Sequence, residues 1–381
     1  MSVLFDEVNV CGMTLKNRFV RSATYEGYAA VDGQPTERLA RLYYELAEGE
    51  VGLIMTSATQ VDGYKNLPEV EGLPYPTAMD DDKFIDHWRP IVDGVHERGS
   101  KFAMQIVHPG RSDTPGLRRA DPIAPSAVPI EATGVTPHAM TTEEIKASVE
   151  QFAQACRRVK EAGFDAVQLH GGHGYLISNF ISPYTNVRED KYGGNTENRA
   201  RFIVEIVERA RELVGADYPI MIKMNCDDFV PGGLDSDEAV KVAKIITEAG
   251  IDCIEVTGGI AESRKQTARK SIVMEMDEAY FRPYAAALKE NVSVPIILVG
   301  GLRTPSVIEK AVQEGAADLV SMSRPFIQEP GLVKRWKEGD LSKAECVSCN
   351  RCGDNVFKRP LVCYIKEKRK EEEKLFAGRK E

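Results

Sequence analysis

Short apolar runs alternate with longer amphipathic segments along most of the chain. The runs are nearly continuous in hydrophobic residues and rich in β-branched ones, which is typical of strands buried on both faces. The segments between them have the three- and four-residue spacing of helices. Eight strands, each followed by a helix, predict an α/β fold in which a parallel sheet closes into a (β/α)₈ TIM barrel. The strands are expected over residues 19–23, 52–59, 101–108, 165–171, 219–225, 253–258, 295–301 and 319–323.

The clearest helix is predicted over residues 141–162. Thr141 and Glu144 have the spacing of a capping box, and Gly163 is a suitable stop at the C-terminal end. An open doubly wound sheet is the alternative fold, but the sequence contains neither of the glycine-rich turns that usually follow its first strand. The barrel is therefore favoured. Further helices are expected near residues 36–48, 80–98, 197–214, 236–249, 279–290 and 305–314, with a short one near 330–337.

Two segments lie outside this repeating pattern. The stretch FDEVNVCGMTLKNRF alternates apolar and polar residues around Cys11 and Gly12, which predicts a short N-terminal β-hairpin. The stretch from Lys366 onward is mostly charged, so we expect a solvated helix or a frayed end. We therefore expect a barrel domain over residues 1–335 and a short C-terminal, cysteine-containing extension over residues 336–381.

Composition excludes some classes of protein. The chain has 49 lysines and arginines against 58 aspartates and glutamates, a net charge of −9. A nucleic-acid-binding protein needs a basic surface, so that function is disfavoured. No apolar run approaches the roughly 18 residues that span a bilayer, and the N-terminus lacks the pattern of a signal peptide. We expect a cytoplasmic protein that binds neither nucleic acid nor a membrane.

Polar side chains gather where the third and fourth strands are expected to end. The stretch VQLHGGHGY has His170 at the end of the fourth strand, with His173 and Tyr175 in the loop after it. Two imidazoles can direct N–H groups at one oxygen, and a phenol can deliver a proton. A metal pair, or loop histidines bonded to the backbone, is the alternative. Gln105, in QIVHPGR, could bond the edge of a flat heteroaromatic ring or simply a neighbouring loop.

Two stretches, the glycine-bearing VGGLRT and the stretch SMSRP, end the seventh and eighth strands. Barrels often bind phosphate between these loops, and Arg324 could add a bidentate contact to the phosphate. Ordinary tight turns with a surface arginine are the alternative. Lys223, on the fifth strand, is either a Schiff-base nucleophile or a fixed cation facing an electron-rich ring, and composition does not separate the two.

Together these stretches resemble the Old Yellow Enzyme family of FMN-dependent ene-reductases. The resemblance runs from Leu4 to about Pro330, through LKNRFV, QIVHPGR, HGGHGYLISNFISPYTNVREDKYGGNTENRARF, VGGLRT and DLVSMSRP in the family's order. It implies a barrel, bound FMN, and NAD(P)H as the hydride donor. The implied reaction reduces the C=C bond of a small α,β-unsaturated carbonyl compound. A homo-oligomer is left open, since many relatives are dimers or larger.

The resemblance also implies roles for individual residues. His170 and His173 match the pair that binds the carbonyl oxygen of the substrate, and Tyr175 matches the donor of a proton to the α-carbon. The residues that match the FMN site are Gln105 at the pyrimidine edge, Ser22 and Ala23 under the ring, Lys223 beside N1 and O2, and Gly300, Gly301, Ser323 and Arg324 around the phosphate.

The sequence departs from the family at the position that faces the flavin C4 carbonyl. Many members have cysteine or threonine there, whereas this chain has Tyr25, preceded by Thr24. A phenol would change the hydrogen bond that tunes the flavin potential, unless Thr24 takes its place through a shifted backbone. Both residues are therefore included in the expected cofactor site, and the potential is left open.

Four cysteines crowd into the extension as C-x2-C-x2-C-x10-C, at Cys346, Cys349, Cys352 and Cys363. Such a set could bind a four-iron, four-sulfur cluster or zinc, or it could be a remnant packed as free thiols. Larger relatives, such as 2,4-dienoyl-CoA reductase and trimethylamine dehydrogenase, have a cluster set that is one residue longer in two gaps. They continue into a second flavin- and nucleotide-binding domain, which a chain of 381 residues is expected to lack. A cluster would then need a partner protein for electron exchange.

Two other functions compete with the ene-reductase prediction. A Schiff-base aldolase built on Lys223 accounts for the phosphate loops but makes QIVHPGR and HGGHGY coincidental. An electron-transfer subunit would act through the cysteine group with a partner protein. The sequence leaves open which alkene is reduced and whether NADH or NADPH is used.

Overall fold

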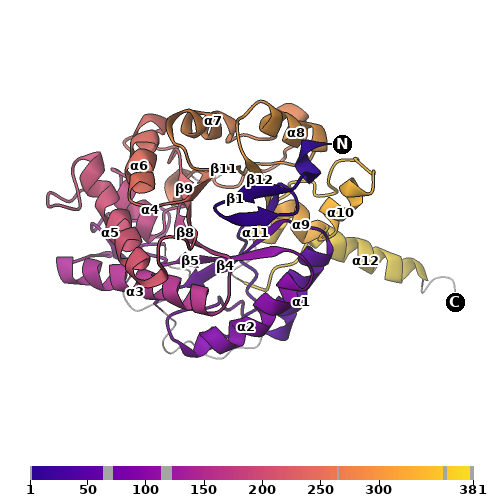
Figure 1. Ribbon diagram of the computed structural model, residues 1–381, viewed down its shortest axis with the longest axis horizontal. Helices are drawn as coiled ribbons and strands as arrows, with labels where there is room; N and C mark the ends of the chain where they lie inside the picture. Colours follow the sequence, from indigo (N-terminus) through magenta and orange to yellow (C-terminus); the bar gives the residue numbers. More distant parts are fainter. Residues whose placement is uncertain (1, 63–71, 113–121, 264–265, 355–357, 378–381) are drawn as a thin grey trace.

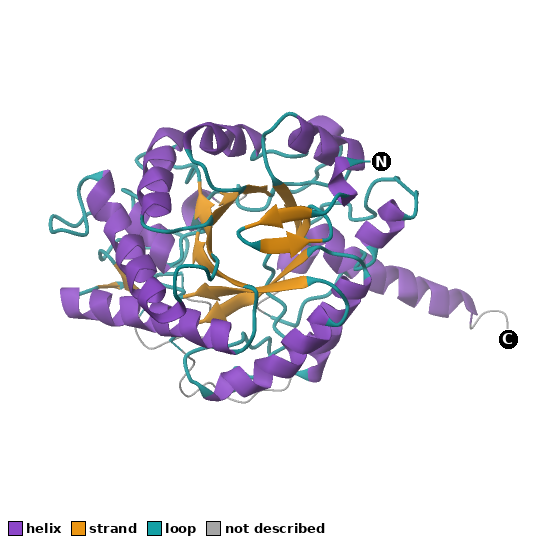
Figure 2. Cartoon of the chain, in the orientation of Figure 1, coloured by secondary structure: helices purple, strands orange, loops and turns teal. Residues whose placement is uncertain are grey.

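A closed barrel of eight parallel strands forms the centre of the molecule (Figures 1 and 2). The computed structural model describes residues 2–62, 72–112, 122–263, 266–354 and 358–377. The strand order around the barrel is β10-β11-β12-β3-β4-β5-β8-β9, so all eight predicted strands are confirmed. They are β3 (Phe19–Arg21), β4 (Leu53–Gln60), β5 (Lys101–Val107), β8 (Ala166–Gly171), β9 (Ile220–Asn225), β10 (Cys253–Thr257), β11 (Ile296–Leu298) and β12 (Leu319–Met322).

Helices form an outer ring around the strands (Figure 2). The predicted capping box is confirmed at the start of α3, where Glu144 N donates to Thr141 Oγ1 (3.2 Å) and Thr141 N donates to Glu144 Oε2 (2.7 Å). Each predicted helix has a counterpart within a few residues of its expected bounds. These are α1 (Glu37–Glu48), α2 (Lys83–His96), α3 (Thr142–Glu161), α5 (Thr196–Val214), α6 (Ser236–Glu248), α7 (Arg282–Asn291), α8 (Pro305–Gln313) and α10 (Leu332–Lys337).

The predicted hairpin closes the N-terminal end of the barrel. Its strands, β1 (Val8–Val10) and β2 (Met13–Leu15), pair antiparallel around the turn at Cys11 and Gly12. Buried side chains of the hairpin pack against residues that begin the barrel strands, among them Leu53 and Cys253. The hairpin lies across the barrel opening in Figure 1. Only the opposite end, where the strands finish, is therefore available for a ligand.

Several short elements were not predicted from the sequence. They are η1 (Val3–Phe5), β6 (Ile123–Ala124), β7 (His138–Ala139), α4 (Leu176–Ile181), η2 (Ala261–Ser263), η3 (Glu275–Asp277), α9 (Arg324–Gln328) and α11 (Arg351–Asp354). Each is too short to show a repeating apolar stripe. The charged tail forms α12 (Tyr364–Ala377), which projects away from the barrel in Figure 1, in agreement with the expected solvated helix. Among the described residues, no helix is long and apolar enough to cross a membrane.

The segment after α10 folds back onto the carboxyl end of the barrel. Ala344 N donates to the carbonyl of Arg303 (2.9 Å), and Leu361 N donates to that of Glu26 (2.8 Å). Between these two contacts, the carbonyl of Ser348 accepts from Ser271 N (3.0 Å). These bonds hold the cysteine-bearing segment beside the loops where the barrel's chemistry is expected. The division of the chain at residue 335 stays a prediction.

Candidate active site

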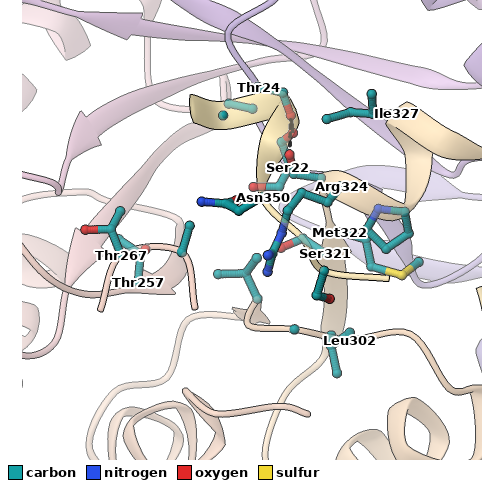
Figure 3. A pocket seen from close by; sticks show the side chains of 18 of the residues that line it. Ser22, Thr24, Thr257, Thr267, Leu302, Ser321, Met322, Arg324, Ile327 and Asn350 are labelled. Atoms are coloured by element: carbon teal, nitrogen blue, oxygen red, sulfur yellow. Dashed lines mark hydrogen bonds between the residues drawn. The ribbon is translucent and has the colours of Figure 1, made fainter. Parts of the chain in front are cut away.

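A cavity of about 240 Å³ opens at the carboxyl end of the barrel. Figure 3 shows Thr257 and Thr267 on one side of it and Arg324, Ser321 and Met322 on the other. The predicted site residues that line it are Ser22, Ala23, Thr24, Tyr25, His173, Lys223, Gly301, Ser323 and Arg324. These residues come from the ends of β3, β8, β9, β11 and β12, as a barrel active site requires.

The remaining predicted residues lie behind this lining. His170 packs against His173, with ring centroids 5.1 Å apart and planes at 80°. Tyr175 also packs against His170, with ring centroids 4.7 Å apart. The structure therefore brings the three predicted catalytic side chains into one cluster. Gly300 precedes Gly301 in the loop after β11, and Gln105 lies buried in β5.

The hydrogen bonds of His170 define which of its nitrogens can donate. Gly172 N donates to His170 Nδ1 (3.3 Å), so the proton of the neutral ring is on Nε2. Burial lowers the pKa of His170 well below its usual value, and the nearby His173 and Lys223 lower it further. A neutral ring of this tautomer can donate one N–H to a substrate oxygen.

His173 is held from both its backbone and its ring. Its backbone has φ of +60°, a left-handed conformation that is unusual outside glycine, and its N–H donates to Asn225 Oδ1 (3.1 Å). Its Nε2 lies 2.8 Å from the hydroxyl of Thr257. Burial lowers the pKa of His173 to about 3, so this ring is also neutral at neutral pH. Two neutral imidazoles are therefore in contact at the cavity, with His173 in its wall and His170 behind it.

Beneath the cavity, polar side chains from several strands form a bonded network. Lys223 Nζ donates to Ser22 Oγ (2.7 Å) and to Glu255 Oε1 (3.1 Å). Gln105 Nε2 donates to Gln168 Oε1 (2.7 Å). Gln168 and Glu255 were not singled out from the sequence. Each stands between two apolar residues of a buried strand, and that pattern was the available signal.

The hydroxyl of Tyr25 forms a hydrogen bond within the protein, in which Oη donates to the carbonyl of Pro74 (2.6 Å). Burial, reinforced by Tyr175, raises the pKa of Tyr25, so the phenol stays protonated. Thr24 Oγ1 lies 2.9 Å from the carbonyl of Ser22, to which it donates, and 2.7 Å from Ser323 Oγ. Neither hydroxyl is unpaired, and both side chains line the cavity.

The end of the cavity near β11 and β12 is suited to an anion. Gly301 has φ of +73°, and a Cβ there would lie 3.0 Å from the ring of Tyr280. Arg324 donates one N–H to the carbonyl of Arg269 (2.8 Å). Arg303 also lines the cavity, and its buried Nε has no partner within the described part of the chain. Arg303 was missed, although it stands in the stretch VGGLRT.

The four late cysteines meet around a second, small cavity. Cys346, Cys349, Cys352 and Cys363 all line it, together with Arg324 and Ile327. All four are free thiols, and burial raises the pKa of Cys352 to about 11. In the described ranges, no three histidine, cysteine or carboxylate side chains stand close enough to hold a single metal ion. Cys352, Arg324 and Ile327 line both this cavity and the larger one.

Comparisons with known proteins agree with this fold. The family model for the NADH:flavin oxidoreductase / NADH oxidase family matches residues 3–342. NADH oxidase of Thermoanaerobacter brockii is 39% identical over 349 residues, which cover 91% of this chain and 52% of the relative. The chain thus spans about half the length of this and several other curated relatives.

Solved structures show the same relationship. 2-Naphthoyl-CoA reductase, in complex with 2-naphthoyl-CoA, superposes with a TM-score of 0.86 at 28% identity, over 95% of this chain and 56% of that one. An Old Yellow Enzyme homologue from Zymomonas mobilis superposes with a TM-score of 0.73 at 27% identity, over 94% and 99%. The fold and the site define an oxidoreductase built on a TIM barrel. The chain belongs to the NADH:flavin oxidoreductase / NADH oxidase family, the Old Yellow Enzyme family.

Proposed function

We propose that this chain binds FMN and reduces the C=C bond of an α,β-unsaturated carbonyl compound with electrons from NAD(P)H. The observation that carries the proposal is the cluster of His170, His173 and Tyr175 at the cavity. Two neutral imidazoles can bind one carbonyl oxygen, and the phenol beside them can donate a proton. Membership of the family supports FMN and NAD(P)H as cofactors.

The residues around the cavity fit FMN. Lys223 supplies a cation in the cavity wall, where a reduced flavin ring carries negative charge. Gly301 leaves room for close backbone approach, and Arg324 supplies a guanidinium for a phosphate. Nε of Arg303, which has no partner among the residues that the structure describes, is a further donor in the cavity wall. Gln105 gives its amide N–H to Gln168, so its carbonyl oxygen is the end that can accept an N–H from a ligand.

When bound, FMN supplies the hydride chemistry. His170 donates from Nε2 to the substrate carbonyl oxygen, and His173 contributes a second contact to the same atom. These donors stabilise the negative charge that grows on the oxygen in the transition state. Tyr175 gives its hydroxyl proton to the α-carbon. Burial raises the pKa of Tyr175, so the phenol is protonated at neutral pH and ready to donate.

The test is an anaerobic preparation of the chain, its absorption spectrum, and turnover of 2-cyclohexenone with NADH and with NADPH. A thioester belongs among the further test substrates, because one similar structure is a complex with 2-naphthoyl-CoA. A yellow protein that consumes NAD(P)H and enone in equal amounts supports the proposal. A protein that binds no FMN, or that binds it and reduces no unsaturated carbonyl compound, overturns it.

We propose as a second function that the cysteine group binds a four-iron, four-sulfur cluster and passes electrons between the flavin and a partner protein. Four thiols around one cavity suit a cluster. A single zinc ion would need them within bonding distance of one point, which the described residues do not offer. Iron and acid-labile sulfide in the anaerobic protein would support the cluster. Turnover of enone by protein that contains no iron would show that the reaction does not require a cluster.

A Schiff-base aldolase is disfavoured by the surroundings of Lys223. A nucleophilic amine must lose its proton and keep its lone pair accessible. Lys223 instead donates to Ser22 and pairs with Glu255, which is fully buried. The lysine nitrogen is thus engaged by a hydroxyl and a carboxylate, not directed at a substrate carbonyl carbon.

A further inference from the structure

Glu255 lies in the middle of the barrel with no exposed surface. It is the one charged residue of β10, between Ile254 and Val256, and it pairs in register with Lys223 on β9. An ionised carboxylate is costly to bury unless it is paired and hydrogen-bonded. Its presence at this depth therefore calls for a specific set of partners.

Four donors from four different parts of the barrel meet the two oxygens of Glu255. Ser22 Oγ (2.6 Å), Ser321 Oγ (2.8 Å) and Lys223 Nζ (3.1 Å) donate to Oε1. Gln168 Nε2 donates to Oε2 (2.9 Å). Burial alone would raise the pKa of Glu255, but the charge of Lys223 and these hydrogen bonds hold it below its usual value. The carboxylate is thus ionised and fully bonded.

Three of these partners touch the cavity, whereas Glu255 does not line it. Ser22, Lys223 and Ser321 are part of the cavity wall. Any effect of Glu255 on a bound ring must therefore act through them. The strongest of these routes is electrostatic, because the carboxylate oxygen is 3.1 Å from the lysine nitrogen and the pair is shielded from water.

The carboxylate of Glu255 also orients a chain of hydrogen bonds that runs through Gln168 to Gln105. Gln168 gives its N–H to Glu255, so its carbonyl oxygen faces Gln105 and accepts from that side chain. Gln105 then gives one of its two amide N–H groups to Gln168. Glu255 in this way fixes the orientation of the Gln105 amide.

We propose that Glu255 is a positioning residue that offsets the positive charge of Lys223 and so lowers the midpoint potential of the flavin. The proposal rests on the proposed binding of FMN. A cation beside a flavin favours the reduced ring, which is anionic, over the oxidised ring, which is neutral. A carboxylate paired with that cation reduces the preference. The chain would therefore hold its flavin at a lower potential than Lys223 alone would give.

The test compares the midpoint potentials of FMN in wild-type protein and in Glu255→Gln, which keeps the size of the side chain and removes its charge. We expect reduced FMN to gain about tenfold in affinity relative to oxidised FMN, an upward shift of about 30 mV for a two-electron couple. Asp165→Asn is the matched control. Asp165 also pairs with a lysine, Lys101 (2.7 Å), but at the opposite end of the barrel, so the potential of that variant should equal the wild-type value.

A charge-pair comparison separates electrostatics from a general loss of structure. Lys223→Gln should lower the potential. Adding Glu255→Gln to Lys223→Gln should then shift the potential by much less than about 30 mV, because the carboxylate has no lysine charge left to offset. If Glu255→Gln by itself fails to fold or to hold FMN, the double variant still decides the matter, since a full upward shift relative to Lys223→Gln would mean that Glu255 acts independently of Lys223. A potential unchanged or lowered in Glu255→Gln, or an equal upward shift with and without Lys223, overturns the inference. Wild-type protein that binds no FMN overturns the proposed function as well, so the two failures are distinguishable.

Discussion

The rings of His170 and Tyr175 meet edge to face, with centroids 4.7 Å apart and planes at 70°. This contact places the phenol against an imidazole that is itself in contact with His173. Tyr175 is the N-cap residue of α4, a helix whose residues are all buried. The three side chains for which we propose catalytic roles therefore form one cluster of contacting rings.

Replacing Tyr175 with Phe should separate the two halves of the reaction. Without the hydroxyl, reduction of an enone should slow by about 10²- to 10⁴-fold, the usual range for loss of a general acid. Reduction of the flavin by NAD(P)H needs no such proton, so its rate should stay within about twofold of wild type. Stopped-flow absorbance of each half-reaction measures both rates.

The control for this experiment is Tyr192→Phe. Tyr192 donates its hydroxyl to Glu205 (2.9 Å) at the start of the α5 region, away from the cavity. Both half-reactions of that variant should match wild type. If Tyr175→Phe slows the two half-reactions equally, Tyr175 is not the proton donor.

Replacing Arg324 with Met should weaken binding of the phosphate without affecting the ring. A hydrogen bond to a charged group contributes roughly 1.5–3 kcal/mol, so the Kd for FMN should rise by about 10- to 100-fold. The Kd for riboflavin, which has no phosphate, should change by less than about threefold. Fluorescence titration of flavin-free protein measures both values, and an equal loss for the two flavins would place Arg324 away from the phosphate.

The barrel was predictable because its signals are local and repeated. β8 and β9 are buried at every position. A strand that is buried on both faces has a nearly continuous run of apolar residues, which can be recognised in the sequence. The proposed catalytic cluster could be predicted because His170, His173 and Tyr175 are close in sequence, at the end of one strand and in the loop after it.

Residues whose hydrogen-bond partners lie on other strands were harder to predict from the sequence. Glu255 has no neighbour in sequence that reveals its partners Ser22 and Ser321, because these come from strands more than 60 positions away. The closure of the barrel alone brings them together. The same reason explains why Asn350, in the cysteine-bearing segment, was not expected to line the larger cavity.

Replacing Cys352 with Ser should remove iron from the anaerobically purified protein if the cysteine group holds a cluster. We expect iron to fall from about four atoms per chain to less than one, since loss of one of four thiolate ligands destabilises such a site. Cys156→Ser is the control, because Cys156 is buried in α3 and belongs to no cysteine group. Metal analysis of both variants decides between a cluster and four free thiols; iron unchanged in Cys352→Ser would contradict the assignment.

Burial of two neutral histidines should make the flavin-free protein less stable in mild acid. His173 has its pKa lowered to about 3, and His170 has its pKa lowered too, both mainly by burial. Histidine in the unfolded chain has a pKa near 6.5, so below that pH the unfolded state takes up protons that the folded state excludes. Their contribution to stability is complete above pH 6.5 and is lost as the pH falls toward 3, by up to about 1.4 kcal/mol per pH unit for each histidine. Urea unfolding at pH 7, 6, 5.5 and 5 should show this decline in the free energy of unfolding. In His173→Asn, the free energy of unfolding should fall less steeply with decreasing pH, because one of the two histidines no longer contributes. Equal slopes in the two proteins would mean that His173 takes up its proton in the folded state.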